Sequence, residues 1–363
     1  MNITFHKNKP LFEGVYIEEI IDHQNTPFYL YSQNNIENTY KYLKDSLKSE
    51  IFYAVKANSN QAILKIIKNC GSGADVVSAG ELERVLEAGF DPSKIIFEGL
   101  GKSEKDIRYA IKKKIRLLNV ESLNELKLID KIGKDLDEVI NTGIRINPDI
   151  DGNTLDKITT GKKTDKFGIN IDQIISNISE LKTLQNINIK GISCHIGSQL
   201  KDIEIFENVF SIMKKIADIF LTHGFKIEHV DLGGGFGVSY ESDINSLNIK
   251  SIGKLVDKIF HQSNFKISFE PGRYLVAKSG IIITKILTSK ENGGINFLIT
   301  DAGMQTLIRP AMYGAVHRIE ALSDLEEENI NYTIAGPICE SSDIIAKNIM
   351  IPKQKINNYL IIH

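Results

Sequence analysis

Four groups of residues that could take part in catalysis or binding each lie at the end of a short apolar run. The first is Lys56. It lies in the run Ile51 to Ala57 (IFYAVKA). Alternation along a strand would place Phe52, Ala54 and Lys56 on one face, so the amine would end an apolar row. Desolvation lowers the pKa of an amine, and a neutral amine is the form that attacks a carbonyl to give a Schiff base. Taken alone, a surface lysine with its stem on apolar atoms is the commoner case.

His195 ends another apolar run, in the sequence CHIGSQ that spans residues 194–199. An imidazole in this position can stack on a flat aromatic ring or transfer a proton, and the hydroxyl of Ser198 can donate to an anion. A hydrogen-bonded core histidine is the alternative interpretation. The position of His195 after a strand favours a role in a site.

A glycine run, DLGGGFG at residues 231–237, follows the next strand-like segment and contains Gly233, Gly234, Gly235 and Gly237. Without Cβ atoms, such a backbone can approach a phosphate and point its N–H groups at it. A dinucleotide-binding fingerprint is disfavoured because Val238 stands where the third glycine would be needed. A flexible structural turn is the remaining alternative.

The sequence EPGR brings Glu270, Gly272 and Arg273 together after the last apolar run of this part of the chain. The carboxylate can act as a general acid or base, or hold a proton on a ring nitrogen. The guanidinium offers a bidentate fork for a phosphate or a carboxylate. Taken alone, the pair would more simply be a salt bridge at a turn.

The four groups together match the needs of pyridoxal 5'-phosphate. Lys56 would hold the cofactor, the glycine run would take its phosphate, and Glu270 would keep the pyridine nitrogen protonated so that the ring is an electron sink. We therefore predict pyridoxal phosphate as the cofactor and no metal.

The elements that must position these groups alternate between short β-rich runs and amphipathic helical stretches from Phe28 to Glu270, a pattern typical of parallel βα units. The predicted strands are 51–57, 74–77, 95–98, 115–120, 141–146, 189–195, 229–233 and 266–270. Predicted helices include 61–68, 80–88, 122–131, 203–222 and 249–262. Eight units predict a (β/α)8 TIM barrel, whose active site lies at the C-terminal ends of the strands.

Local signals support this barrel. Ser78 and Glu81 form a predicted capping box at the start of one helix, and Gly89 is the predicted stop of that helix. The longest interruption, residues 147–168, is polar and contains three glycines, which favours a functional loop.

After Arg273 the pattern changes to strand-like runs without helical partners. These runs are 281–287, 297–300, 332–335 and 359–362. They predict a mostly β domain, sandwich- or barrel-like, which the strand-like pieces before Phe28 could join. The predicted domains are a barrel at 28–275 and a discontinuous β domain at 1–27 plus 276–363.

Composition narrows the class of protein. The 44 Lys and Arg against 46 Asp and Glu give a net charge of -2, which provides no global field for nucleic acid or an anionic membrane. The three cysteines have no paired spacing, which indicates a reducing compartment such as the cytoplasm. The first ten residues lack the apolar core of a signal peptide, and no run is long enough for a membrane span.

Several motifs resemble one family from about Phe28 to the last residue. They are YAVKAN with Lys56, CHIGSQ with His195, GGGFG from Gly233, EPGR with Glu270, IRPAMYGAVH with Arg309 and Tyr313, and GPICESSD with Cys339 and Glu340. The chain resembles the barrel-type, alanine-racemase-like pyridoxal-phosphate enzymes, and among them the diaminopimelate decarboxylase family.

The resemblance implies the roles of individual residues. Lys56 would carry the cofactor, His195 would lie against its ring, Ser198 and the glycine loop would serve its phosphate, and Glu270 would pair with its ring nitrogen. The remaining implied residues bind the substrate's carboxylates or supply a proton: Arg273, Arg309 and Tyr313 for the carboxylates, Cys339 for the proton that replaces CO2. Cys339 and Glu340 are implied to enter the site of a neighbouring subunit, and hence to make a homodimer.

The resemblance also implies a reaction. A racemase of this type places an arginine near the ring nitrogen, whereas Glu270 favours loss of CO2. Glu340, Arg309 and Tyr313 suit a substrate whose far end carries an ammonium and a carboxylate. This predicts decarboxylation of meso-diaminopimelate to L-lysine, with carboxynorspermidine, ornithine or arginine as alternative substrates.

The C-terminus departs from the family pattern. The pattern continues past a strand of this kind into a glycine-bearing motif with a tyrosine that reaches cofactor and substrate, whereas this sequence ends at His363. We therefore expect a missing C-terminal piece, and the alternative to an active enzyme is a noncatalytic truncated homologue.

Overall fold

The computed structural model describes residues 3–6, 9–152, 160–240, 247–323 and 325–363. Its internal contacts divide the chain into two compact units. The barrel unit comprises Ile36–Val238 and Asn245–Val276, and the β unit comprises Met1–Asn35, Ser239–Ile244 and Ala277–His363.

Parallel strands form a closed ring in the barrel unit. Each strand pairs with the next in the chain, and the last pairs with the first, so the sheet has no open edge. The strands of the ring are β5 (Glu50–Ala54), β6 (Gly73–Val76), β7 (Ile95–Phe97), β8 (Leu117–Val120), β9 (Ile140–Asn147), β11 (Ile187–Ser193), β12 (His229–Asp231) and β13 (Lys266–Phe269). The predicted (β/α)8 fold is confirmed, and each of the eight predicted runs overlaps one of these strands.

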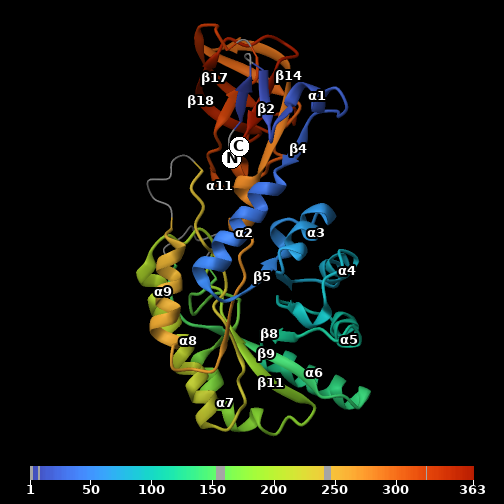
Figure 1. Ribbon diagram of the computed structural model, residues 1–363, viewed down its shortest axis with the longest axis vertical. Coiled ribbons are helices and arrows are strands. Elements are labelled where there is room, and N and C mark those ends of the chain that lie inside the picture. The colour runs from blue at the N-terminus through green and yellow to red at the C-terminus, as the bar shows by residue number, and fades with distance from the viewer. Residues whose placement is uncertain (1–2, 7–8, 153–159, 241–246, 324) are drawn as a thin grey trace. The chain divides into compact units, whose positions relative to one another are not determined.

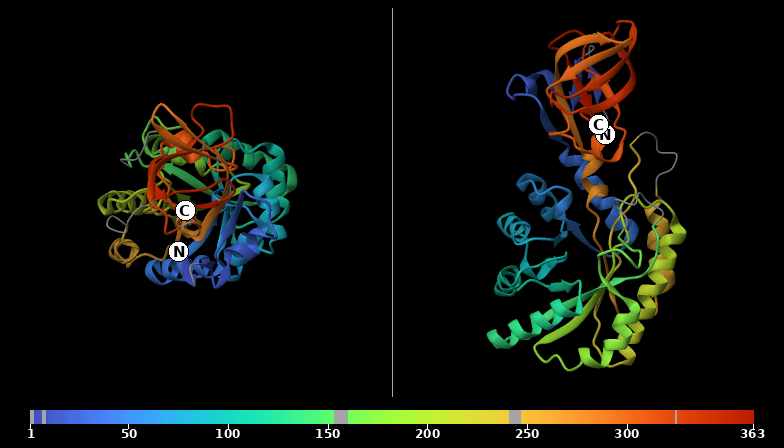
Figure 2. Two further views of the ribbon diagram at one scale, coloured as in Figure 1. Left: turned by 90° about the horizontal axis from the view of Figure 1, so that it is seen from above. Right: turned by 180° about the vertical axis from the view of Figure 1, so that it is seen from behind.

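Helices cover the outside of the ring. They are α2 (Gln33–Leu47), α3 (Gln61–Asn69), α4 (Ala79–Glu87), α5 (Glu104–Lys112), α6 (Leu123–Leu136), α7 (Ile171–Leu181), α8 (Ile203–Thr222) and α9 (Ile249–Phe260). Figure 1 shows α3 to α6 along one side of the strands and α7 to α9 along the other, and the rear view in Figure 2 shows the same arrangement. Their apolar faces are buried, for instance eight residues of α8, which begins and ends as predicted.

The predicted capping box at α4 forms only in part. The Ser78 hydroxyl accepts a hydrogen bond from the N–H of Glu81 at 3.2 Å, as expected for an N-cap. The Glu81 carboxylate, however, accepts from the N–H of Val77 at 2.9 Å instead of the N–H of Ser78. The helix ends at Glu87, and Gly89, the predicted stop, follows with a φ of +87°, a conformation that favours glycine.

The predicted functional loop after β9 is described apart from residues 153–159. The side chain of Asn147 donates to the carbonyl groups of Lys162 and Phe167, at 2.9 and 3.1 Å. The short strand β10 (Ile169–Asn170) then pairs in parallel with the end of β9. Both ends of the loop are therefore fastened to the C-terminal end of the barrel.

In the part of the β unit that the structure describes, the strands form one seven-stranded sheet and one three-stranded sheet. The larger sheet comprises β4 (Phe28–Tyr31), β14 (Gly280–Asn292), β15 (Ile295–Thr300), β16 (Ile319–Ala321), β17 (Asn329–Ala335), β18 (Ile344–Pro352) and β19 (Tyr359–Ile362). A mostly β domain was predicted and is confirmed.

The prediction that pieces before Phe28 join this sheet was wrong. Strands β1 (Thr4–His6), β2 (Lys9–Phe12) and β3 (Val15–Tyr16) form a sheet of their own. Phe12 and Ile17 nevertheless share a buried cluster with Ile281 and Ile283 of β14. The N-terminal sheet is therefore attached through side chains and not through strand pairing.

Candidate active site

Polar side chains gather at the C-terminal ends of the barrel strands, and Lys56 is among them. It was predicted to continue the first strand, but β5 ends at Ala54 and Lys56 lies in the 3-10 turn Val55–Ala57. The turn ends the strand alternation after Ala54, which pairs with Asp75 of β6, and Asp75 is the residue that the Lys56 amine contacts. The Lys56 side chain is 47% exposed, and its Nζ lies 3.2 Å from Oδ2 of Asp75, which is fully buried.

The charge state of Lys56 also differs from the prediction. Burial alone would lower the pKa of Lys56, but the negative charges of Asp75 and Glu270 outweigh burial, and the pKa lies above its ordinary value. Burial raises the pKa of Asp75, and Lys56 opposes that shift. The amine is thus held as an ammonium beside a buried counter-ion, not as the neutral amine expected from desolvation.

His195 follows β11 and is neutral. Burial lowers the pKa of His195 well below its ordinary value, and the charges of Lys56 and Arg145 lower it further. The N–H of Gly234 donates to Nδ1 of His195 at 3.4 Å, which assigns the ring proton to Nε2. A neutral imidazole held from one edge suits stacking on a flat ring.

The glycine run follows β12 as predicted, and neighbouring backbone explains why glycines stand there. A Cβ on Gly233, Gly234 or Gly235 would lie 2.3 Å from a carbonyl oxygen of Cys194, Glu270 or Gly197, respectively. Gly233 and Gly235 also have positive φ angles, of +70° and +79°.

The loop after β11 interlocks with this glycine run. Leu200 forms an isolated parallel bridge with Phe236, and the side chain of Gln199 bonds both the N–H and the carbonyl of Val238. A Cβ on Gly237 would lie 2.7 Å from the carbonyl of Leu200. The predicted phosphate residue Ser198 lies in this loop and is partly buried.

Glu270 follows β13 and is buried with one carboxylate oxygen, Oε1, that has no hydrogen-bond partner in the described structure. Burial raises the pKa of Glu270 well above its ordinary value, and the charges of Asp231, Asp75 and Glu98 add to the shift. A buried, unpartnered oxygen at a barrel mouth indicates a missing donor, such as a protonated ring nitrogen.

Gly272 and Arg273 continue from Glu270. A Cβ on Gly272 would lie 3.0 Å from the Cβ of Ala57 and 3.1 Å from that of Ala54, so the turn that carries Lys56 packs closely on this glycine. Arg273 begins the short helix α10 (Arg273–Val276) and is partly buried.

The sequence analysis missed Arg145, Glu121 and Glu98, which are buried among the predicted site residues. Nη1 of Arg145 donates to Oε1 of Glu121 at 2.7 Å, and Oε2 of Glu121 accepts the N–H of Gly168 at 2.7 Å. Burial would lower the pKa of Arg145, but the charges of Glu121, Glu98 and Glu270 raise it. A charged residue in or directly after an apolar strand was the signal that identified Lys56, and the same rule would have found these three.

The remaining predicted residues belong to the β unit. Arg309 and Tyr313 are the first and last residues of helix α11 (Arg309–Tyr313), and Nη1 of Arg309 donates to Nε2 of His317 at 2.9 Å. The Arg309 guanidinium also lies over the ring of Tyr240, at 4.6 Å. Cys339 and Glu340 are exposed, in a turn between β17 and β18.

The barrel residues pass a test of fit for pyridoxal phosphate. An amine at the rim, a neutral imidazole, a glycine run and an orphaned acidic oxygen match the aldehyde, the ring face, the phosphate and the ring nitrogen of that cofactor. No group of His, Cys, Asp and Glu that could hold a metal occurs among the described residues. The fold and this rim together define a barrel enzyme that uses pyridoxal phosphate.

Comparison with known proteins supports the class of pyridoxal-phosphate enzyme. Residues 33–277 match the pyridoxal-binding domain of pyridoxal-dependent decarboxylases. The diaminopimelate decarboxylase of Haemophilus influenzae is 37% identical over 352 residues, which are 96% of this chain and 85% of that protein. The chain therefore belongs to the pyridoxal-dependent decarboxylase family, within its diaminopimelate decarboxylases.

Solved structures give the same result. Diaminopimelate decarboxylase from Helicobacter pylori, complexed with L-lysine, matches with a TM-score of 0.91 and 37% identity over 95% of this chain and 87% of that one. The enzyme from M. jannaschii, also with L-lysine, has a TM-score of 0.93 and 32% identity over 99% of this chain and 86% of that one.

Among the described residues, no helix combines the length and apolar character needed to cross a bilayer.

Proposed function

We propose that this chain converts meso-diaminopimelate to L-lysine and CO2. The observation that carries the decarboxylase chemistry is Glu270, a buried carboxyl group that is free to face a ring nitrogen. Similarity to diaminopimelate decarboxylases, two of them solved with L-lysine, supports the substrate.

Bound pyridoxal phosphate supplies an electron-poor ring that accepts the electron pair left when the carbon–carboxylate bond breaks. Glu270 holds the proton at the ring nitrogen, which keeps the ring electron-poor. His195 supports one face of the ring, and the glycine run with Ser198 and Arg273 holds the phosphate. Lys56 fixes the cofactor's reactive carbon at the rim, with Asp75 as the counter-ion of its amine.

In this proposal the β unit supplies the groups for the substrate. Arg309 and Tyr313 bind a carboxylate, Glu340 binds an ammonium group, and Cys339 donates the proton that replaces CO2 on the α-carbon. The described turn leaves Cys339 and Glu340 exposed, which suits residues that a second copy would receive. We infer a homodimer with shared sites, located in the cytoplasm, where the three cysteines would stay reduced.

Release of CO2 by the purified protein tests the reaction. The protein would be supplied with pyridoxal phosphate and, in separate assays, meso-diaminopimelate, carboxynorspermidine, ornithine or arginine. We expect turnover of diaminopimelate and none in Lys56→Ala. Turnover of ornithine without turnover of diaminopimelate would overturn the proposed substrate, and protein that never takes up cofactor would favour a noncatalytic role.

Mixing two inactive variants tests the shared sites. In a dimer assembled at random from Lys56→Ala and Cys339→Ala chains, about a quarter of all sites would contain both native residues. We therefore expect activity to return on mixing to about a quarter of the wild-type value. A mixture that stays inactive after subunit exchange is demonstrated by mass spectrometry would show that each site is built from one chain.

A further inference from the structure

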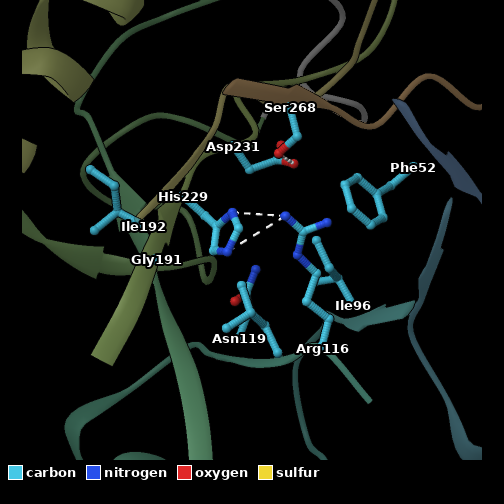
Figure 3. A pocket seen from close by; sticks show the side chains of 10 residues that line it. Phe52, Ile96, Arg116, Asn119, Gly191, Ile192, His229, Asp231 and Ser268 are labelled. Atoms are coloured by element: carbon cyan, nitrogen blue, oxygen red, sulfur yellow. Dashed lines mark hydrogen bonds between the residues drawn. The ribbon is translucent and has the colours of Figure 1, made fainter. Parts of the chain in front are cut away.

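Asp231 is a buried carboxylate that the proposed chemistry does not use. It ends β12 opposite Ser268 of β13 and is 3% exposed. Its Oδ2 accepts a hydrogen bond from the Ser268 hydroxyl at 2.5 Å, and its Oδ1 accepts the N–H of Gly233 at 2.7 Å. Figure 3 shows the side chains of Asp231 and Ser268 pointing toward each other. Asp231 thus joins the two strands where they separate into loops.

Gly233, whose N–H bonds to Asp231, lies in a loop that also contacts Glu270 and His195 of the candidate site. The carbonyl of Gly233 accepts the N–H of Glu270 at 2.8 Å. The next residue, Gly234, donates its N–H to Nδ1 of His195 at 3.4 Å. The hydrogen bond from Gly233 to Asp231 therefore sets the start of a loop that contacts both Glu270 and His195.

A carboxylate in this position is costly for stability. Burial raises the pKa of Asp231 to about 7, while the hydrogen bonds from Ser268 and Gly233 oppose the shift. An apolar residue would remove the buried charge but would leave the N–H of Gly233 without its acceptor. The side chain is therefore best explained by the two groups that it holds.

We propose that Asp231 is a positioning residue that fixes the glycine loop against the Glu270 segment, so that the sites for the phosphate and the ring nitrogen of the cofactor keep a set separation. The proposal rests on the cofactor assignment and is independent of the substrate. Asp231 acts through Gly233 and Ser268 and need not touch the cofactor itself.

Binding of two related ligands tests the proposal. Dissociation constants for pyridoxal phosphate and for pyridoxal, which lacks the phosphate, would be measured by calorimetry on the cofactor-free protein without substrate. We expect Asp231→Ala to weaken binding of pyridoxal phosphate about tenfold and binding of pyridoxal much less, because the loop serves the phosphate. Asp231→Asn should stay within about threefold of wild type, since its amide oxygen can still accept from Gly233.

Two serine variants separate positioning from stability. Ser268→Ala removes one hydrogen bond of Asp231, whereas Ser72→Ala removes a buried hydroxyl bonded to the carbonyls of Ile51 and Gly73 at the opposite end of the strands. We expect both to lower the melting temperature and only Ser268→Ala to weaken binding of pyridoxal phosphate, by about threefold.

Three results would overturn the proposal: wild-type affinity in Asp231→Ala, equal losses for the two ligands, or equal losses in the two serine variants. If Asp231→Ala does not fold, the serine pair decides. Wild-type protein that binds the cofactor but releases no CO2 from diaminopimelate would refute the proposed function and leave this test intact.

Discussion

The Nζ atom of Lys56 lies 3.2 Å from Oδ2 of Asp75, so the candidate cofactor lysine has a buried counter-ion. The negative charge of Asp75 contributes to the raised pKa of Lys56. Attachment of a carbonyl group requires the neutral amine, so with Lys56 as the proposed cofactor lysine this pair would set the pH at which the cofactor attaches.

Asp75→Asn should lower the pH needed for attachment. Loss of the charge lowers the pKa of Lys56, so the midpoint of covalent attachment should move down by about one pH unit. The attached fraction would be fixed by borohydride reduction and measured by mass spectrometry across a pH series. Glu83→Gln, which removes an equal charge from an exposed position in α4, is the control. An unchanged midpoint in Asp75→Asn would show that Asp75 does not set the charge of Lys56.

Gly235→Ala should destabilise the barrel unit and abolish cofactor binding. The new Cβ would lie 2.3 Å from the carbonyl oxygen of Gly197, and the φ of +79° is unfavourable for alanine. We expect a loss of about 2 kcal/mol or more in the free energy of unfolding, measured by urea denaturation. Gly80→Ala, in α4 where nothing lies closer than 3.9 Å, should instead be neutral or stabilising by up to about 1 kcal/mol. Similar effects of the two variants would contradict the packing described for the glycine loop.

His229 should make folding sensitive to acid. It lies at the edge of a cavity of about 10 Å³ inside the barrel, with Nδ1 2.9 Å from Nη2 of Arg116 (Figure 3). Burial, together with the positive charge of Arg116, lowers the pKa of His229 to about 4. Because the unfolded chain binds this proton near pH 6.5, the contribution of neutral His229 is complete above that pH and is lost as the pH falls toward 4.

The comparison with His229→Gln separates this effect from that of the buried carboxyl groups. Their raised pKa values increase the free energy of unfolding as the pH falls, whereas neutral His229 decreases it. We expect the free energy of unfolding of wild type to fall relative to the variant by up to about 3 kcal/mol between pH 7 and pH 4. Urea denaturation at several pH values measures the difference, and His261→Gln, which removes an exposed histidine, serves as the control. A difference that does not change with pH would refute the assignment.

His317 should control the proposed carboxylate-binding role of Arg309. Because a guanidinium only donates, Nε2 of His317 accepts from Arg309 at 2.9 Å, and Nδ1–H then donates to the backbone oxygen of His363 at 2.7 Å. His317→Gln can still accept the hydrogen bond from Arg309. The shorter side chain of His317→Asn keeps only a donor for the backbone oxygen of His363. We expect His317→Asn to raise KM for diaminopimelate about tenfold with a smaller change in kcat, and His317→Gln to stay within about threefold. The reverse order of the two KM values would contradict this role.

The barrel was predictable from sequence because each buried strand and each amphipathic helix carries its own local pattern. The end of the first strand was not, because the 3-10 turn at Val55–Ala57 has no distinct signal and YAVKA reads as a continuous strand. The raised pKa of Lys56 depends on Asp75, which the ring brings next to it from another strand. Local desolvation, the effect considered from sequence, was therefore outweighed by a charge that only the fold supplies.

The β unit was harder to predict because its pairing is less regular. Strand β14 continues past Leu287 into the exposed polar residues 288–292, which carry no apolar alternation. Strand β18 was missed, and it contains Asn348 with a φ of +57° within a register shift against β17. Such an irregularity interrupts the two-residue period on which strand prediction depends.

The direct pairing of β13 with β5 also governs when a cofactor site can exist. Lys56 follows the first strand of the ring and Glu270 follows the last. The ribosome therefore adds Lys56 near the start of the barrel and Glu270 near its end. A nascent chain that has not yet released β13 from the ribosome contains the lysine and the glycine loop but cannot close the ring around them. We therefore expect this chain to bind its cofactor only after β13 has paired with β5.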